Sequence, residues 1–249
     1  MTIKVFFRKV RTLTNIIKYK LLEKRYGKGK LRYLFYGCNS DSLIICFSAF
    51  PPKEKPIYNY VRGFQNFNMD RLYIGDYWGY RGSYYLYENG KNDPFEQTSS
   101  LIKNYLEKGH YKYVYTAGTS KGGSAALFYG LLFKVNAIFS GACQYYIGDW
   151  LGVKVHRKIL EGMMGKEAGE KEKNYLNGII PGMVKSNKGT TTKVHLVYSK
   201  LEHTYPEHIV HLINDLKTND IETSEHVCTF VNHDDVGHYF LPYVQSVLK

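Results

Sequence analysis

The sequence predicts an α/β fold with a mostly parallel sheet covered by helices on both faces. The first observation is that, beyond residue 70, short β-branched and aromatic runs alternate with segments of helical periodicity. The second is composition: 44% of the 249 residues are hydrophobic, enough for the core of one large domain. The alternation favours parallel strands joined by helical crossovers.

The first half of this domain is predicted to begin with a hairpin. Two apolar runs, 31–36 and 42–48, flank the turn sequence GCNSDS. Residues 57–68 have a pattern compatible with a helix, 71–76 form a short apolar strand, and 77–92 form a long aromatic loop. A helix then begins at Asp93, because Asp is a good cap and Pro94 suits the first turn. It ends at Gly109.

The second half continues the alternation with one interruption. Residues 144–190 contain glycines, methionines and a charged run, and we interpret them as a small inserted lid. The expected strands are 112–118, 136–141, 193–199 and 226–232, and the expected helices are 120–134, 206–216 and 239–248. We therefore expect an N-terminal arm, residues 1–30, followed by one domain, residues 31–249.

The positive charge of the chain is concentrated in that arm. The net charge is +12, and residues 1–32 contain eleven Lys or Arg against one acid, Glu23. The rest of the chain is nearly neutral, so a nucleic-acid-binding fold is not indicated. Apolar residues at helical spacing make the arm a basic amphipathic helix, which can pack on the domain, lie on an anionic membrane surface or bind a partner.

Signal-peptide features, apolar run lengths and cysteine spacing indicate where in the cell the protein is located. The arm contains no unbroken apolar stretch of the kind found in signal peptides, and no run is long enough to cross a bilayer. The four cysteines form no C-x-x-C pair, and two of them lie in apolar strand-like runs. We expect a cytoplasmic protein, with the arm as the means of any peripheral attachment to the inner face of the membrane.

The segment YVYTAGTSKGGSAALFYG carries the most specific functional motif. Gly118-Thr119-Ser120-Lys121-Gly122 is a G-x-S-x-G sequence between a predicted strand and a predicted helix. This is the nucleophile elbow, in which glycines two residues either side of the serine avoid a clash in a tight turn. The helix N-terminus supplies unpaired N–H groups, so the N–H of Lys121 is expected to face an oxyanion.

A serine nucleophile needs a base and an acid, and the chain offers both in the order that this motif requires. Glu202 follows the strand 193–199, and His238 follows the strand 226–232 near the last helix. We therefore predict a Ser120–His238–Glu202 triad. His233 is the rival base in the same loop, and Asp234 and Asp235 are rival acids.

Two further predictions concern the surroundings of Ser120. The loop after the first central strand should provide a second oxyanion donor, the N–H of Ala49 or of Phe50. The aromatic loop, with Tyr77 and Trp78, and the lid residues Gln144, Tyr145 and Asp149 form a candidate sugar platform, although packing between loop and lid explains them equally well. No metal site is expected, because His203, His208 and His211 have no matching ligand set.

At GTSKGGSAALFYG and SGACQYYIGDWLG the sequence resembles α/β-hydrolase-like bacterial proteins of surface-glycan pathways. These are capsular-polysaccharide biosynthesis proteins and the acyltransferase-like component of the accessory secretion system. The resemblance runs from about residue 43 to the C-terminus and departs from the pattern at Cys143. It implies the α/β-hydrolase fold, a Ser–Glu–His triad, and esterase or O-acyltransferase chemistry on a carbohydrate.

We therefore expect a serine esterase or O-acyltransferase, with O-acetyl transfer favoured, acting on a bacterial surface or capsular polysaccharide. An esterase needs no cofactor, whereas a transferase needs an acyl donor such as acetyl-CoA. One alternative is a non-catalytic scaffold of glycan biosynthesis, tethered by residues 1–30. Another is a polyanion-binding protein that uses the arm, although a nucleic-acid partner is not favoured.

Overall fold

The computed structural model describes residues 19, 21–27, 29–51 and 57–248. Residues 1–18, 20 and 28 of the predicted arm lie outside the described residues, whereas Lys24–Arg25 near its end form a strand of the sheet. No helix in the described part of the chain combines the length and the apolar character needed to cross a membrane.

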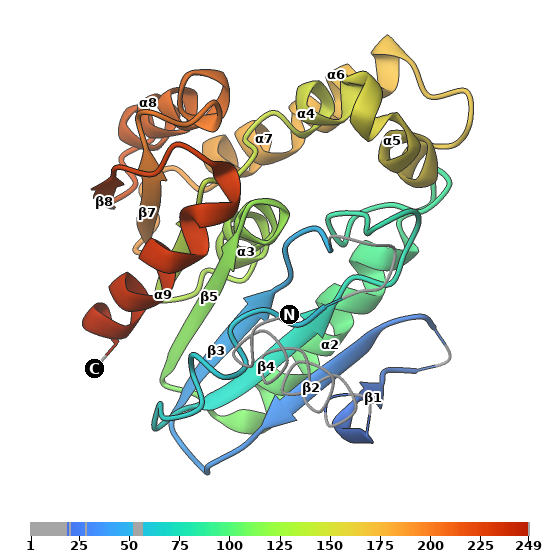
Figure 1. The fold of residues 1–249 in the computed structure, drawn as a ribbon. Helices are drawn as coiled ribbons and strands as arrows, with labels where there is room; N and C mark the ends of the chain where they lie inside the picture. Colours follow the sequence, from blue (N-terminus) through green and yellow to red (C-terminus); the bar gives the residue numbers. More distant parts are fainter. Residues whose placement is uncertain (1–18, 20, 28, 52–56, 249) are drawn as a thin grey trace, which may run out of the picture.

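Within these residues, eight strands form one sheet in the order β1-β2-β4-β3-β5-β6-β7-β8 (Figure 1). The strands are β1 (Lys24–Arg25), β2 (Arg32–Tyr36), β3 (Ser42–Phe47), β4 (Asp70–Gly75), β5 (Tyr113–Thr119), β6 (Ala137–Gly141), β7 (Lys193–Ser199) and β8 (Thr223–Cys228). Strands β3 to β8 run parallel, and β2 is antiparallel to both β1 and β4. The predicted mostly parallel sheet is confirmed.

The predicted hairpin between 31–36 and 42–48 is wrong. Strand β4 lies between β2 and β3, and β2 pairs with β4 instead. The apolar run of β3 is almost completely buried, which suits a central strand, and both of its edges are already paired, with β4 and β5. A strand in that position cannot also pair with the segment that precedes it.

Helices cover both faces of this sheet. They are α2 (Asp93–Gly109), α3 (Lys121–Leu132), α4 (Ile147–Gly152), α5 (Arg157–Met164), α6 (Glu170–Asn177), α7 (Ile179–Ser186), α8 (Val210–Thr218) and α9 (Val236–Val247). Side chains along β3 alternate between two cores: Ile45 packs with residues of α2, α3 and α8, whereas Ile44 packs with residues of α9. A strand buried on both faces is expected in a parallel sheet between two helix layers.

The predicted helix over 57–68 is also wrong, because this segment forms turns. Tyr60 has φ of 62°, a left-handed conformation that no residue inside an α-helix adopts. Its neighbours Val61 and Phe64 are nevertheless buried against the α9 side of the sheet. The helical pattern therefore marks apolar burial correctly but not the backbone conformation.

The predicted lid segment forms four helices, α4 to α7, between β6 and β7. In Figure 1, α4, α5 and α6 lie together beyond one end of the sheet, at the top of the picture. Strands β5, β7 and β8 end toward the same region, which is the carboxyl edge where parallel α/β sheets hold their functional groups.

Candidate active site

Ser120 forms the sharp turn between β5 and α3. Its backbone has φ of 54° and ψ of −128°, and its N–H donates to the carbonyl of Gly141 on β6 at 2.8 Å. A side chain on either flanking glycine would collide with backbone. A Cβ on Gly118 would lie 2.2 Å from the carbonyl oxygen of Gly122, and a Cβ on Gly122 would lie 2.4 Å from that of Phe47. These contacts explain why the motif has glycine at both positions.

Ser120 lies at one end of a continuous line of hydrogen bonds. Its hydroxyl is 2.8 Å from Nε2 of His233, and Nδ1 of the same imidazole is 3.0 Å from Oε1 of Glu202. Because a carboxylate only accepts, the Nδ1–H of His233 donates to Glu202, and Nε2 is then free to accept the serine proton. The structure thus brings together a hydroxyl, an imidazole and a carboxylate from the ends of β5, β8 and β7.

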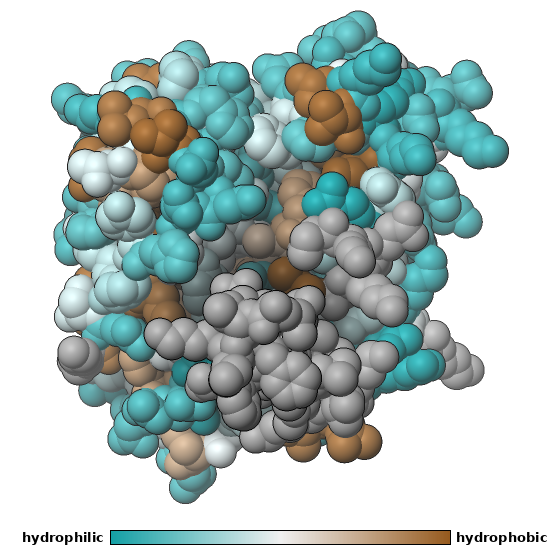
Figure 2. Space-filling view, viewed as in Figure 1, coloured by the Kyte–Doolittle hydropathy of each residue, from teal (hydrophilic) through white to brown (hydrophobic). Residues whose placement is uncertain are grey.

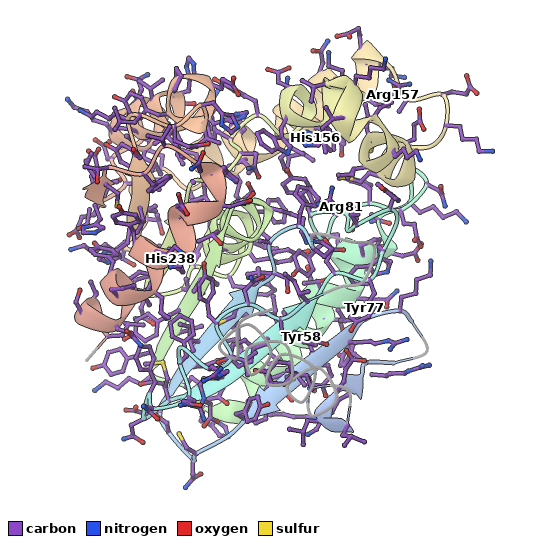
Figure 3. The ribbon with its side chains drawn as sticks, viewed as in Figure 1. Tyr58, Tyr77, Arg81, His156, Arg157 and His238 are labelled. Carbon is purple, nitrogen blue, oxygen red and sulfur yellow. The ribbon has the colours of Figure 1, made fainter. Side chains whose placement is uncertain are left out.

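The prediction of His238 as the partner of Ser120 is wrong, and the rival His233 takes that position. His233 lies in the short helical turn η3 (His233–Asp235), directly before α9. His238 lies inside α9, on which it is labelled in Figure 3, and its side chain is exposed. The buried face of α9 is formed by Val236, Phe240 and Val244, so position 238 falls on the opposite side of the helix.

Glu202 is held in place independently of the histidine. Its side chain is fully buried, and Oε2 accepts hydrogen bonds from the backbone N–H of Thr204, at 3.2 Å, and from the Thr204 hydroxyl. Burial by itself raises the pKa of Glu202, but the hydrogen bonds from His233 and Thr204 outweigh it and lower the pKa below the ordinary value. The carboxylate therefore stays ionised at neutral pH. The rival acids Asp234 and Asp235 have no hydrogen bond to His233 among the described residues.

Three backbone N–H groups near Ser120 were predicted as oxyanion donors: that of Lys121, and either that of Ala49 or that of Phe50. As the first residue of α3, Lys121 has an N–H with no acceptor inside the helix. The N–H of Ala49 already donates to Oδ1 of Asn59 at 2.9 Å. Among the described residues the N–H of Phe50 has no acceptor, and Phe50 lines the cavity beside Ser120. The geometry therefore favours Phe50 over Ala49 as the second donor.

Gln144 contacts the serine, which the sequence analysis did not anticipate. Its Nε2 donates to the Ser120 hydroxyl at 3.1 Å, and its Oε1 accepts from Tyr84 at 3.2 Å. The residue is completely buried, so it cannot form part of an open sugar platform. It positions the serine side chain instead.

The cavity at Ser120 has a volume of about 520 Å³. In Figure 2 it appears as a hollow between the lid side and the C-terminal side of the molecule, with apolar surface inside. Its wall combines aromatic rings with polar groups, which come from the loop after β3, the 57–60 segment, the β4–α2 loop and the lid. They include Phe50, Tyr60, Trp150, Asn59, Arg81 and His156. Figure 3 labels Arg81 and His156 on this side of the structure.

The other predicted platform residues are not on the wall formed by the described residues. Trp78 and Tyr145 are buried in the core. The Tyr77 hydroxyl bonds to Glu23, and Asp149 pairs with Asn177 on the lid. These four residues therefore do not form the predicted platform, and Trp150, one residue beyond the predicted set, reaches the cavity instead.

Of the three histidines that the sequence analysis set aside, one lies at the triad. Nδ1 of His203 lies 2.7 Å from Oε1 of Glu202, whereas His208 is buried and accepts the N–H of Tyr146 at 3.3 Å. Burial lowers the pKa of His208 to about 4, which keeps it neutral. The only sequence feature that indicated the contact between His203 and Glu202 is that the two residues are adjacent in the chain.

The sheet order, the elbow and the helices on both faces define the α/β-hydrolase fold, and comparison with solved structures agrees. The capsule O-acetyltransferase of Neisseria meningitidis serogroup A, solved in complex with CoA, superposes with a TM-score of 0.77 at 22% identity, covering 92% of this chain and 96% of that one. A fluorophosphonate-binding serine hydrolase of Staphylococcus aureus gives a TM-score of 0.62 at 10% identity, with 88% and 92% covered.

A third similar structure is a glycosylation-associated protein complex from Streptococcus agalactiae. Its TM-score is 0.74 at 15% identity, and the match covers 88% of this chain but 44% of the other. No family model and no curated protein matches the sequence. These likenesses show that the chain has the α/β-hydrolase fold that the resemblance implied.

Proposed function

We propose that this chain is a serine-dependent esterase or O-acyltransferase that acts on a bacterial surface or capsular polysaccharide. The acyl group that it removes or transfers is an acetyl group. The observation that carries the proposal is the line from the Ser120 hydroxyl through His233 to Glu202, with distances of 2.8 and 3.0 Å. Hydroxyl, base and acid in contact are the requirement for acyl transfer through a serine ester.

The catalytic steps follow from this geometry. Nε2 of His233 takes the proton of Ser120 as the oxygen attacks the ester carbonyl, and Glu202 stabilises the imidazolium that forms. The N–H groups of Lys121 and Phe50 stabilise the oxyanion. His233 then protonates the leaving group, an alcohol from an ester or the thiol from a thioester donor, which leaves an acyl-Ser120 intermediate.

The second half-reaction determines whether the enzyme is an esterase or a transferase. Either water or a sugar hydroxyl, deprotonated by His233, attacks the acyl-serine and receives the acyl group. For a transferase the first substrate is an acyl donor such as acetyl-CoA. The structural likeness to a capsule O-acetyltransferase that binds CoA supports this branch without distinguishing it from hydrolysis.

The cavity supports a carbohydrate substrate. Rings such as Trp150 and Phe50 provide apolar surface, while Asn59, Arg81 and His156 provide hydrogen-bonding groups. Sugars have both apolar faces and hydroxyl edges, and sites that combine a few polar groups with aromatic walls suit such ligands. The likeness to a glycosylation-associated complex supports the same substrate class.

Two experiments test the proposal. A fluorophosphonate probe should label the wild-type protein and His238→Ala, but not Ser120→Ala, and His233→Ala should reduce the labelling rate by several powers of ten. Acetyl release from a panel of acetylated glycans, measured with and without an acceptor sugar, then identifies the acceptor. Absence of labelling in a folded wild-type sample would refute the proposal.

The basic arm is proposed as a tether to an anionic membrane surface or to a glycan-synthesis partner, although its end, Lys24–Arg25, belongs to the sheet as β1. A protein lacking residues 1–18, which keeps β1, should still hydrolyse a soluble ester while losing attachment to anionic vesicles or to that partner. Loss of hydrolysis in a folded truncated protein would show that the arm belongs to the active site.

A further inference from the structure

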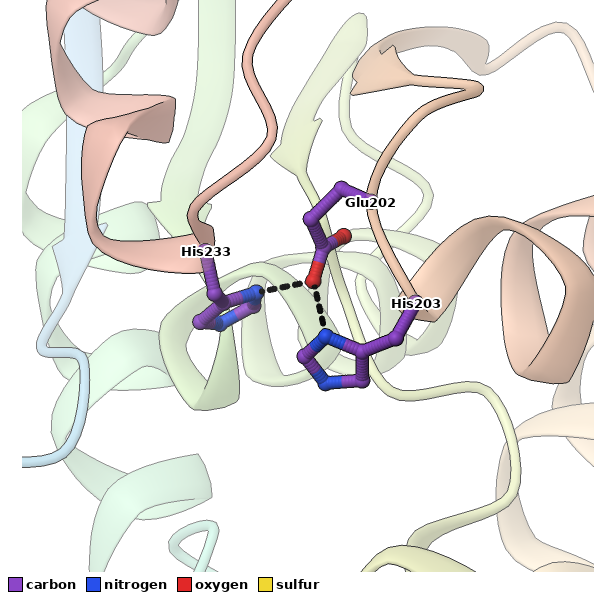
Figure 4. Close-up of side chains that lie close together, drawn as sticks. All are labelled: Glu202, His203 and His233. Carbon is purple, nitrogen blue, oxygen red and sulfur yellow. Dashed lines mark hydrogen bonds and ion pairs between the residues drawn. The ribbon is translucent and has the colours of Figure 1, made fainter.

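A second histidine contacts the acid of the triad. Nδ1 of His203 is 2.7 Å from Oε1 of Glu202, the same oxygen that accepts Nδ1–H of His233 at 3.0 Å (Figure 4). One carboxylate oxygen thus has two imidazole nitrogens within 3.0 Å, that of His233 in a hydrogen bond and that of His203 in close contact. The three ligand atoms lie within 4.8 Å of one another.

This donor set is one that zinc uses in proteins. Two histidine nitrogens and one glutamate oxygen, with water at the fourth position, form a known tetrahedral zinc environment. We propose that Glu202, His203 and His233 form a binding site for Zn²⁺ or a similar transition-metal ion, and that occupation of this site blocks the triad. The binding itself is independent of the proposed function, whereas the inhibition rests on it.

The atoms are already close to the positions that a metal needs. With metal–ligand distances of about 2.0 to 2.2 Å, the donors of a tetrahedral ion are about 3.3 Å apart. The two nitrogen–oxygen distances of 2.7 and 3.0 Å need to lengthen by about 0.6 and 0.3 Å. The nitrogens of His203 and His233 approach each other by side-chain rotation, which the half-exposed His203 allows.

The surroundings hold the ligands and leave a path to solvent. Glu202 is fixed by Thr204 and cannot turn away. The ring of His203 stacks on Trp150, with centroids 5.4 Å apart and planes 14° from parallel. Side-chain exposures of 48% for His203 and 20% for His233 mean that an ion can reach both rings from solvent.

The effect on catalysis follows from the position of one proton. In the active form His233 carries its proton on Nδ1 and uses the Nε2 lone pair as the base. A metal ion bound at Nδ1 needs a lone pair on Nδ1 itself, so Nδ1 loses its proton and the proton of the neutral ring moves to Nε2 through exchange with solvent. No proton is released overall, but Nε2–H now donates to Ser120 and cannot accept the serine proton.

Direct binding to an inactive variant tests the site without reference to any activity. Isothermal titration of Ser120→Ala, prepared without a histidine tag, with zinc chloride should show one equivalent bound. Adding His203→Ala to this variant should weaken the affinity by a factor of about ten or more, because a ligand is lost. Adding His238→Ala instead, which removes an exposed histidine of α9, should leave the affinity unchanged.

The possible results of these titrations either support the metal site or overturn it. Equal zinc affinity with and without His203→Ala, no saturable binding, or equally tight binding of Mg²⁺, which prefers oxygen ligands, would each overturn the proposal. Tetrahedral Co²⁺ absorption bands that disappear in His203→Ala would support it.

Inhibition is then measured on the active protein. Zinc should slow ester hydrolysis, a chelator should restore it, and His203→Ala should need about ten times more zinc or higher for the same inhibition. If zinc binds as predicted but the fluorophosphonate does not label the metal-free protein, the proposed function fails and the metal site stands. Labelling without His203-dependent zinc binding would give the reverse conclusion.

Discussion

The ion pair below the nucleophile elbow makes a quantitative prediction about stability. Lys121, the residue after the nucleophile, has a completely buried side chain whose Nζ lies 2.7 Å from Oδ2 of Asp76. Asp76 also accepts from the backbone N–H and the hydroxyl of Ser83, at 2.8 and 3.2 Å. Burial lowers the pKa of Lys121, and the Asp76 carboxylate opposes that shift.

Lys121→Met keeps most of the apolar stem and removes the charge, which leaves the Asp76 carboxylate buried with only the two Ser83 donors. Removal of one partner from a buried pair costs about 3–5 kcal/mol in free energy of unfolding. For a domain of this size that corresponds to a fall in melting temperature of roughly 6–20 °C. Asp76→Asn in the same chain removes the unpaired charge and should recover a large part of the loss.

Urea denaturation followed by circular dichroism measures these free energies, with unchanged m-values as the check on two-state unfolding. The matched control is Lys103→Met. Lys103 pairs with Glu107 at 3.7 Å, but both side chains are more than 60% exposed. This change should cost less than about 1 kcal/mol. The reasoning is refuted if Lys121→Met costs no more than Lys103→Met, or if the double variant is less stable than the single one.

Three further predictions follow from the same structure. His233→Ala should lower ester hydrolysis by several powers of ten while His238→Ala retains it, and the opposite ranking in initial-rate assays would restore the original assignment. Gly122→Ala should prevent normal folding, since its Cβ would lie 2.4 Å from the Phe47 carbonyl oxygen, whereas Gly182→Ala, with nothing within 4 Å, should be neutral or stabilising by circular dichroism melts. Burial and the Lys193 charge lower the pKa of His195 to about 4, so an unfolded chain binds a proton there below about pH 6.5 and the folded chain does not. Stability should therefore be lost as pH falls from about 6.5 to 4, and His195→Gln should reduce that slope by about one proton; an unchanged slope in denaturation curves at several pH values would contradict this.

The local chemistry of the elbow could be predicted from the sequence because it depends on neighbours in the chain. A strand, a serine between glycines and a helix are all consecutive, and the clash that excludes side chains at Gly118 and Gly122 involves backbone only a few residues away or on the adjacent strand. Glu202 could also be predicted, since it directly follows β7 and parallel strands end at one edge of the sheet.

The choice between His233 and His238 was not available from the loop sequence. It depends on where α9 begins and which of its faces is buried, and the burial of Val236 and Phe240 places residue 238 in solvent. Element boundaries are set by packing against the rest of the fold and are therefore less predictable than the elements themselves. Packing also explains why the predicted sugar platform was wrong. Aromatic residues of the 77–92 loop such as Trp78 and Tyr85 are buried in the core, and the loop sequence does not reveal this.

The sequence by itself determined the kind of sheet, the place of Ser120 in the elbow and the place of Glu202 after β7, because each depends on residues that are close together in the chain. Only the tertiary structure decided which histidine reaches Ser120, that Gln144 contacts the same hydroxyl, and that His203 shares the carboxylate of Glu202. Apart from the 202–203 pair, those contacts join residues that are 24 and 113 positions apart, and they are created when the strand ends are brought to one edge. A periodic pattern predicts which face of a helix or strand is buried, but it does not predict which residues of other elements contact that face.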